Sequence, residues 1–445
     1  MNSQPEPPLA VHGIDFGTST SLIMVGRPGT APLLIRDPLA AHGEVGVPTS
    51  VCARPDGSLA VGFEAERIKQ LRIRDYRTGF KLDVGLEKTD LLGGRGYSPD
   101  QLMAEVIRFL RARALAAVPA EPAVVVLTVP VKWQEWTRGL AVAACASAGY
   151  DPAAVRLHTE PVAALAGLGP LPGRTVVYDL GGGTFDCAVA VDDGDGPQIY
   201  GEPYGLRHVG GRAFDDLVLR HVRGAFPQAE LVFKPAEGEQ AAADVDPDVL
   251  RRRVQLREKC VEAKIELSFI ETTEKLLSEV NPAVLLTLDR ATLSKLIGGL
   301  VEETVDECER MLKALALAPG EIAQFLQIGG SSRIPLTGDR LGKRFRRAVT
   351  IIEEPELAVV RGATSLALQL AAPATKVSEP TTDLDPRPAL VPGRSLWKDP
   401  SPEPGPVPSP EPDPVPSPEP GPAPPPDEPE HRLGNYDPAR NLFDE

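Results

Sequence analysis

The chain has 445 residues, of which 42% are hydrophobic, and a formal net charge of −15 at pH 7. This length exceeds what a single hydrophobic core usually supports, so we expect at least two lobes. About half of the excess negative charge lies after Lys376, and no basic cluster marks a surface for nucleic acid. The charge distribution therefore excludes DNA or RNA as a partner.

Cysteine usage and hydropathy indicate the compartment. The five cysteines are widely spaced and form no Cys-x-x-Cys pair, which favours buried thiols in a reducing environment over disulfides or a metal site. The N-terminal stretch lacks a basic region followed by an apolar run, and no segment has the length and hydropathy of a membrane span. We expect a cytoplasmic, monomeric protein that does not contact membranes.

The first 372 residues alternate strand and helix patterns. We expect a strand pair at 9–25, a loop-rich segment to about 97, a helix at 98–117 capped by Ser98 and Asp100, a strand at 122–131, a helix at 133–150, a second strand pair at 174–191, long helices at 248–270 and 291–315, and a last strand at 322–332. This alternation predicts an α/β protein with mostly buried sheets.

Residues 373–445 have a different composition. Between 401 and 424 an eight-residue unit occurs three times, with proline at every second position. Proline fixes φ and lacks an N–H group, so this segment predicts a disordered, extended polyproline tail. The tail would either carry its apolar end, residues 431–445, to a protein partner or serve as an inert solubilising segment.

One pattern occurs twice in the folded part. The stretches "GIDFGTSTSLIMV" and "YDLGGGTFDCAVAV" match at three offsets, which pair Asp15 with Asp179, Gly17 with Gly181, and Thr20 with Thr184. Two related halves, about 164 residues apart, explain these matches better than coincidence does.

The repeated turn suits phosphate chemistry. Glycines let backbone N–H groups converge on an anion, and an aspartate beside them can hold the water shell of Mg²⁺. Two such turns facing each other would clamp a triphosphate and its metal. A turn-forming role for Asp15 and Asp179 is the alternative. No Gly-x4-Gly-Lys-Ser/Thr sequence is present, which excludes a P-loop enzyme, and no Gly-x-Gly-x-x-Gly opens a helix after a strand.

Eight motifs then occur in one order: "GIDFGTSTS", "VVLTVPVKWQEWTR", "TEPVAALAGLG", "YDLGGGTFD", "GGRAFDD", "EAKIELS", "IGGSSRIP" and "EPELAVVRGA". In these motifs the sequence resembles the nucleotide-binding domain of the seventy-kilodalton heat-shock chaperone family over about residues 9–370. The resemblance implies the α/β actin-like ATPase fold, with two lobes of repeated mixed sheet and helices around a nucleotide cleft. It places the first lobe at 9–165, the second at 166–372 with an inserted helical subdomain at about 210–300, and the tail at 373–445.

The resemblance also implies ATP or ADP with Mg²⁺ as the ligands, and roles for individual residues. Asp15 and Asp179 would hold the metal through water, Glu160 and Asp186 would order the attacking water and the metal, Thr184 would contact the γ-phosphate, and Lys81 would be the catalytic lysine. The residues expected along the nucleotide are Gly17, Thr18, Ser19, Gly181, Gly182, Gly183, Gly210, Gly211, Glu262, Lys264, Ser268, Gly329, Gly330, Ser331, Arg333 and Glu356.

Some of these positions have a plainer interpretation, and others depart from the family. Lys81 could be a solvated surface lysine. Trp133 and Trp136 are expected to fill the core, with a partner surface as the alternative. Val261 and Ile265 stand where the family has a glutamate and an arginine beside the adenine, which would weaken base stacking. The family's apolar linker and peptide-binding domain have no counterpart after residue 372.

The expected function is slow ATP hydrolysis by positioning and charge stabilisation. Closure of the lobes would be read by a separate protein, through Pro130, Arg138 and Glu160, at positions where the family relays its nucleotide state. Two alternatives stay open: an actin-like scaffold that assembles with ATP, and a pseudo-ATPase that binds nucleotide without turnover. A sugar kinase is disfavoured because no sugar-pocket signal is visible.

Overall fold

Two sheets with matching strand order organise the computed structural model, which describes residues 9–41, 44–192, 197–234 and 245–372. The predictions for the tail at 373–445 lie outside these residues. The first sheet has the order β11-β10-β1-β2-β3, and β4 also pairs with β2. Its strands are β1 (Ala10–Phe16), β2 (Thr20–Gly26), β3 (Leu33–Leu34), β4 (Val47–Pro48), β10 (Pro122–Val129) and β11 (Val155–Thr159).

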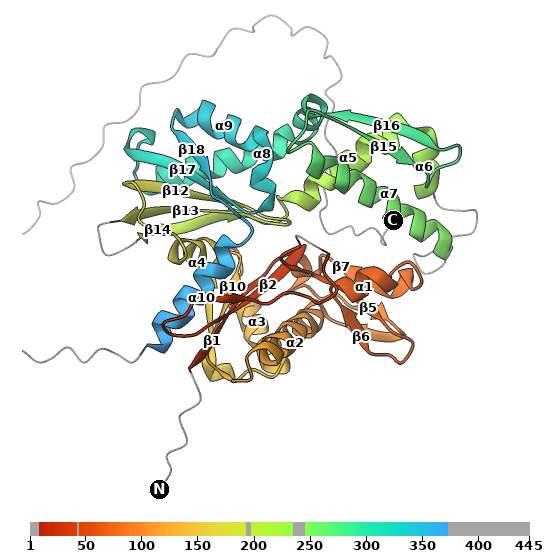
Figure 1. Cartoon of the computed structure of the whole chain (residues 1–445). Helices are drawn as coiled ribbons and strands as arrows, with labels where there is room; N and C mark the ends of the chain where they lie inside the picture. The colour runs from red at the N-terminus through yellow and green to blue at the C-terminus, as the bar shows by residue number, and fades with distance from the viewer. Residues whose placement is uncertain (1–8, 42–43, 193–196, 235–244, 373–445) are drawn as a thin grey trace, which may run out of the picture. The chain divides into compact units, whose positions relative to one another are not determined.

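The second sheet repeats this arrangement (Figure 1). Its order is β18-β17-β12-β13-β14, with strands β12 (Arg174–Leu180), β13 (Phe185–Asp192), β14 (Pro197–Leu206), β17 (Ile322–Ile328) and β18 (Ala348–Ile351). In each sheet the first strand runs antiparallel to the second and parallel to a later one. The internal repeat predicted from the two turns is therefore confirmed by the topology.

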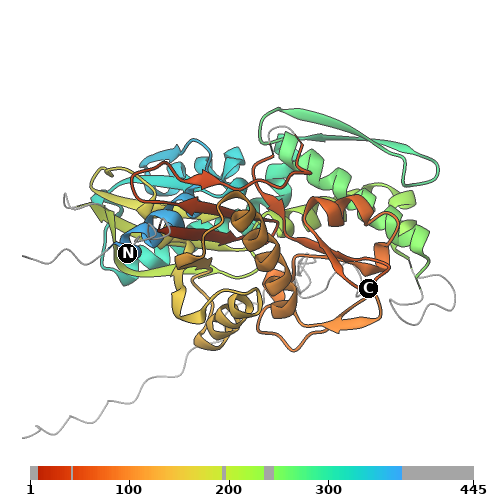
Figure 2. The same cartoon turned by 60° about the horizontal axis from the view of Figure 1, so that its bottom comes forward.

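Helices cover the outer face of each sheet. On the first sheet, α2 (Pro99–Ala117) and α3 (Glu135–Ser147) pack against each other (Figure 2). They enclose one continuous hydrophobic core with β1, β2 and β10. On the second sheet, the core is closed by α5 (Gly211–Ala225), α7 (Pro247–Glu266), α8 (Arg290–Ala314) and α9 (Pro335–Phe345). Beyond α5 lie the short helix α6 (Pro227–Phe233) and the hairpin of β15 (Thr272–Leu277) and β16 (Val284–Asp289).

Two helices lie between the sheets. α4 (Glu160–Ala166) and α10 (Ala358–Ala371) share one core with Val11 and Val126 of the first sheet and with Val177 of the second. They cross closely, because a Cβ at Gly362 would come within 1.5 Å of the carbonyl oxygen of Ala163. Only glycine permits this approach.

α10 lies in the range 166–372 expected for the second lobe, and it packs against β1, β2, β10 and α4. A Cβ at Gly13 of β1 would lie 2.3 Å from the hydroxyl oxygen of Thr364 in α10, so helix and strand are in direct contact. The chain thus completes the second sheet with β18, and the helix that follows, α10, packs on the first sheet.

The loop-rich segment before residue 97 contains more structure than expected. A small sheet of order β6-β5-β7 and the hairpin of β8 and β9 form there, beside the helix α1 (Phe63–Ile68). The strands are β5 (Ser50–Ala53), β6 (Leu59–Val61), β7 (Tyr76–Thr78), β8 (Asp90–Leu92) and β9 (Arg95–Tyr97). A 3₁₀ turn at Phe80–Asp83 follows β7 and carries Lys81.

Other differences from the sequence prediction are local. β18 was not predicted, and β17 ends at Ile328 rather than at 332. At the start of α2, the Gln101 side chain accepts a hydrogen bond from the Ser98 N–H, so Gln101 joins Ser98 in the cap. Trp133 is buried as expected, but Trp136 is 70% exposed and does not belong to the core. Within the described ranges, no helix has the length and apolar character needed to cross a membrane.

Candidate active site

The two repeated glycine turns lie against each other. The turn after β1 places Thr18 and Ser19 beside the turn after β12. A Cβ at Gly182 would come within 2.6 Å of the Ser19 hydroxyl oxygen, and a Cβ at Gly183 within 2.5 Å of the Thr18 hydroxyl oxygen. Side chains larger than hydrogen at these glycines would fill the space between the turns. The predicted pairing of the two turns is therefore present in the fold.

Thr49 holds the first of these turns in place. Its hydroxyl donates to the Gly17 carbonyl oxygen at 2.8 Å, and its N–H donates to the Ser19 carbonyl oxygen at 2.8 Å. Both carbonyls are thereby drawn toward Thr49. No sequence pattern singles out Thr49, which lies 30 residues after Ser19 in the chain.

A further glycine pair borders the second turn. The N–H of Gly211, the first residue of α5, donates to the Gly181 carbonyl oxygen at 3.0 Å. A Cβ at Gly210 would lie 2.8 Å from the Gly183 nitrogen, and one at Gly211 would lie 2.7 Å from the Ser331 hydroxyl oxygen. The predicted residues of three separate motifs thus meet at one place.

Four carboxylates surround one lysine beneath the turns. Lys81 is 2% exposed, and its ammonium forms an ion pair of 2.7 Å with Glu160, the first residue of α4. The surface-lysine interpretation of Lys81 is therefore wrong. Asp15 at the end of β1 and Asp186 in β13 also act on the charge of Lys81, and Asp179 ends β12 beside them. Lys81 lies among these four acids, and the charge of Lys132 also acts on Asp186.

The strand register brings two of these acids together. Asp179 of β12 is paired directly with Asp186 of β13. Like charges directly opposite each other destabilise a sheet, so packing alone does not account for this pair. One Asp186 oxygen accepts the Val131 N–H at 3.0 Å, whereas the other is buried without a hydrogen-bond partner. Buried carboxylate oxygens rarely lack a partner, so this oxygen calls for an explanation other than packing.

Burial and mutual repulsion change how these acids titrate. Burial, and then the charge of Glu160, raise the pKa of Asp15 to about 7, although Lys81 and the Thr128 hydroxyl oppose the rise. The same two causes raise the pKa of Asp179 and of Asp186 well above the ordinary value. Burial alone would lower the pKa of Lys81, but Glu160 and Asp15 outweigh it and the pKa is raised. Lys81 therefore stays charged, and the three aspartates hold their protons more tightly than ordinary carboxyls do.

This arrangement fits a hydrated Mg²⁺ ion and phosphates. The described residues contain no group of three or more His, Cys, Asp or Glu side chains placed to hold a metal directly. Mg²⁺ keeps several waters and takes one or two carboxylates, so ligation through water suits the separated acids. A hydrated Mg²⁺ with phosphates would give the unpartnered Asp186 oxygen a partner. The phosphates would occupy the space that the glycines leave between the turns.

Other predicted residues lie farther along the second lobe. Lys264 of α7 is buried, 2.6 Å from Asp215 and 3.1 Å from the Gly211 carbonyl oxygen. A Cβ at Gly329 would lie 2.5 Å from an Asp179 oxygen, so the Gly329–Gly330 turn borders the acids. Just after α7, the half-buried Ser268 donates its N–H to Ile265.

Two acids predicted at the nucleotide are engaged with protein cations. Arg333 and Glu356 form an ion pair of 2.9 Å. Glu262 lies on an exposed part of α7, where it pairs with Lys259 and Lys275 at 3.3 Å each. Glu262 therefore faces the β15–β16 hairpin, and no described contact joins it to the glycine turns.

Sequence reasoning missed several supporting residues. The Thr128 hydroxyl, in β10, donates to Asp15 at 3.1 Å, and these two residues are register partners. A lone hydroxyl at the end of the apolar run "AVVVLTV" could have signalled this contact. Asp215, which fixes Lys264, and Val131, which donates its N–H to Asp186, gave no comparable signal because their partners are distant in sequence.

The repeated sheets, the crossing helices and the paired glycine turns define a class, the two-lobed proteins with the actin-like ATPase fold. A family model described as "Hsp70 protein" matches residues 82–383. The chain belongs to this family. It is 28% identical over 368 residues to the chaperone protein DnaK of Thermosipho melanesiensis. The aligned region covers 81% of this chain and 59% of that relative. The chain thus spans less than two thirds of the length of this relative.

Proposed function

We propose that this chain binds ATP together with Mg²⁺ between its two glycine turns and hydrolyses it slowly to ADP and phosphate. One observation carries the proposal: four buried acids face the turns with a single lysine between them, and one oxygen of Asp186 has no partner. A protein that used these residues for folding alone would pair them. The family relationship supports the same chemistry.

The turns would bind the phosphates. Backbone N–H groups of Gly182 and Gly183, with the hydroxyls of Thr18 and Ser19, would contact the β- and γ-phosphates, since no Cβ blocks their approach. The Gly181 N–H was expected to join them, but it donates to the Thr184 carbonyl oxygen at 3.1 Å and closes the turn. Gly17, Gly210 and Gly211 would keep the backbone close to the same oxygens. The close contact between the two turns supports this role.

The buried acids would prepare the water and the metal. Asp15 and Asp179 would hold the shell of Mg²⁺, which would neutralise phosphate charge when bound. Asp186 would orient the attacking water with its unpartnered oxygen, beside Glu160. Thr184 would contact the γ-phosphate. Lys81, fixed by Glu160 at 2.7 Å, would stabilise the charge that develops on the transferred phosphoryl group.

The rest of the nucleotide would lie along the second lobe. Lys264, Ser268, Gly329, Gly330 and Ser331 are the residues proposed there, and the convergence of Gly211, Ser331 and Lys264 supports this placement. Arg333 would lie along the nucleotide, held by Glu356 at 2.9 Å, and Glu356 matches an acid that the family has near the metal. The charge of Glu262 is engaged by two lysines, so its role would be indirect.

We further propose that the nucleotide regulates a separate protein partner. α4 and α10 lie between the two sheets, and α4 begins with Glu160, so a ligand that moves this acid also acts on the contact between the lobes. Pull-downs with ATP, with ADP and without nucleotide should recover different partners. Identical partners in all three conditions would contradict the regulatory role.

Phosphate production tests the enzymatic part. Wild-type protein with Mg²⁺ and ATP should release phosphate, and Asp179→Asn should not, while both retain binding of a fluorescent ADP analogue. Binding without phosphate from the wild type would identify a pseudo-ATPase. Sedimentation that depends on ATP would identify a scaffold that assembles.

A further inference from the structure

A pocket extends from buried residues at the reacting end of the site to exposed residues of both lobes. Its inner wall contains Lys81, Thr184 and Asp186, which are proposed to act on the γ-phosphate. Its outer wall contains Lys132, which follows β10, and Arg207, which follows β14. None of the residues proposed for the adenosine lines this pocket. The pocket is therefore distinct from the path by which a nucleotide would enter.

The outer end carries positive charge from both lobes. Lys132 and Arg207 are exposed, whereas Trp133 beside them is buried and forms an apolar wall. Inward from these cations the next charged groups are Lys81 and Asp186. An anion that left the reacting end along this route would be attracted outward by two cations.

At the outer end of the pocket, Lys132 of the first lobe contacts two residues of the second lobe. The Lys132 ammonium lies 3.9 Å from a Glu307 oxygen of α8 and 5.7 Å from the ring centre of Tyr204 in β14. Both contacts are long, and the Lys132 side chain is 44% exposed. Glu307 is buried and also pairs with Arg310 at 2.5 Å, so its charge does not depend on Lys132. A small separation of the lobes would therefore break both Lys132 contacts.

The size of the pocket indicates what it passes. Its free volume, about 10 Å³, is room for the centre of one water molecule. Water can occupy it as the structure stands, but a phosphate ion needs the walls to move apart. After hydrolysis, ADP would still fill the nucleotide side of the cleft, and the freed phosphate would lie against Lys81 and Thr184. The pocket would offer this phosphate a route lined by none of the residues proposed for the adenosine.

We propose that this pocket is the exit for inorganic phosphate, with Arg207 and Lys132 as the groups that draw the anion to solvent. The inference rests on the proposed ATP hydrolysis. It predicts that residues at the outer wall control the release of phosphate without altering its formation.

A single-turnover experiment tests the exit. ADP formation is followed by acid quench and phosphate release by a fluorescent phosphate-binding sensor, at low salt, on the same samples. In Arg207→Glu, release should lag behind ADP formation by about threefold or more, because the added carboxylate repels phosphate. Arg207→Lys keeps the charge and should behave as the wild type.

A second variant tests the passage itself. Leu206 is half-buried and lines the pocket, so Leu206→Trp should fill it and delay release in the same way, about threefold or more. If release keeps pace with ADP formation in both Arg207→Glu and Leu206→Trp, the exit lies elsewhere. If the wild type forms no ADP, the proposed hydrolysis is wrong, and the exit is wrong with it.

Discussion

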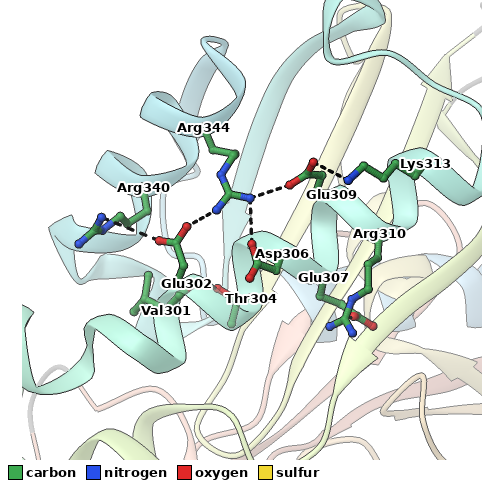
Figure 3. Close-up of polar contacts among 10 residues, drawn as sticks. All are labelled: Val301, Glu302, Thr304, Asp306, Glu307, Glu309, Arg310, Lys313, Arg340 and Arg344. Atoms are coloured by element: carbon green, nitrogen blue, oxygen red, sulfur yellow. Dashed lines mark hydrogen bonds and ion pairs between the residues drawn. The ribbon is translucent and has the colours of Figure 1, made fainter. Parts of the chain in front are cut away.

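Two clusters in this protein each combine several acids with a central basic residue, but the pKa values of their acids shift in opposite directions. On the surface, Arg344 of α9 bridges Glu302, Asp306 and Glu309 of α8 (Figure 3). In the interior, Lys81 faces four acids. Hydrogen bonds from Lys313 and Arg344 lower the pKa of Glu309, whereas burial and neighbouring acids raise the pKa of the interior aspartates.

The difference lies in solvation and in satisfied hydrogen bonds. Each acid in the Arg344 cluster has a cation within reach and water beside it, so the cluster needs no ligand. In the Lys81 cluster, desolvation is the largest cause of every raised aspartate pKa. Buried charge that its own protein leaves uncompensated indicates a site built for an outside cation.

The largest expected effect is on catalysis. Asp179→Asn removes one charge beside the metal and should lower the rate of ADP formation about 10³-fold, since groups that stabilise phosphoryl transfer contribute at this scale. Quenched-flow or filter-binding assays of ADP measure it. Asp306→Asn, in the Arg344 cluster, is the matched control and should leave the rate unchanged. Similar losses in both variants would contradict the distinction between the clusters.

The next effect is on stability. Lys81→Ala leaves Glu160 buried without its partner and should lower the free energy of unfolding by about 3 kcal/mol. Urea unfolding of the ligand-free protein measures this. The double variant Lys81→Ala/Glu160→Ala should recover part of the loss because the unpaired charge is gone. A double variant less stable than the sum of the two single changes would argue against the ion pair.

The pH dependence follows from Asp15. Its pKa is raised to about 7 in the folded protein, so between pH 4 and 7 the unfolded chain has already lost a proton that the folded protein keeps. The stability of the ligand-free protein should therefore fall as pH rises through this window. Burial lowers the pKa of His12 to about 4, which acts in the opposite direction.

The comparison with Asp15→Asn isolates the contribution of Asp15 from that of His12. Thermal unfolding midpoints of the two proteins should converge at pH 4, and the wild type should lie a few degrees below the variant at pH 7.5. Parallel curves over the whole range would mean that Asp15 titrates as an ordinary carboxyl.

The smallest effect belongs to the surface cluster. Arg344→Ala removes several ion pairs at once, yet these are exposed, and the loss in unfolding free energy should be about 0.5 kcal/mol. Urea unfolding at low and high salt measures it, and salt should shrink the difference further. A loss comparable to that of Lys81→Ala would remove the contrast between the clusters.

Site residues could be predicted from the sequence where their role shows in the residues next to them along the chain. Asp15 and Asp179 could be recognised because an acid between an apolar strand and a glycine turn is unusual, and the repeat of the pattern predicted two matching sheets. Residues that act through tertiary contacts could not be found. Thr49, Val131 and Asp215 reach the site from distant segments, and the packing of α10 on the first sheet depends on the close fit of Gly13 against Thr364.

Exposure was similarly hard to predict. Trp133 and Trp136 are three positions apart and looked alike in sequence, but only the first turns into the core. Lys81 had a weak local match and could have been a surface residue. Its burial against Glu160 depends on α4, which begins 79 positions later.

The central claim is that the interior acids are completed by Mg²⁺ and nucleotide together. Calorimetric titration of ADP into the wild type, with Mg²⁺ and with chelator, tests it most directly. We predict that Mg²⁺ strengthens ADP binding about tenfold or more in the wild type. In Asp15→Asn/Asp179→Asn this gain should disappear while metal-free ADP binds as before. Equal strengthening by Mg²⁺ in both proteins would contradict the account.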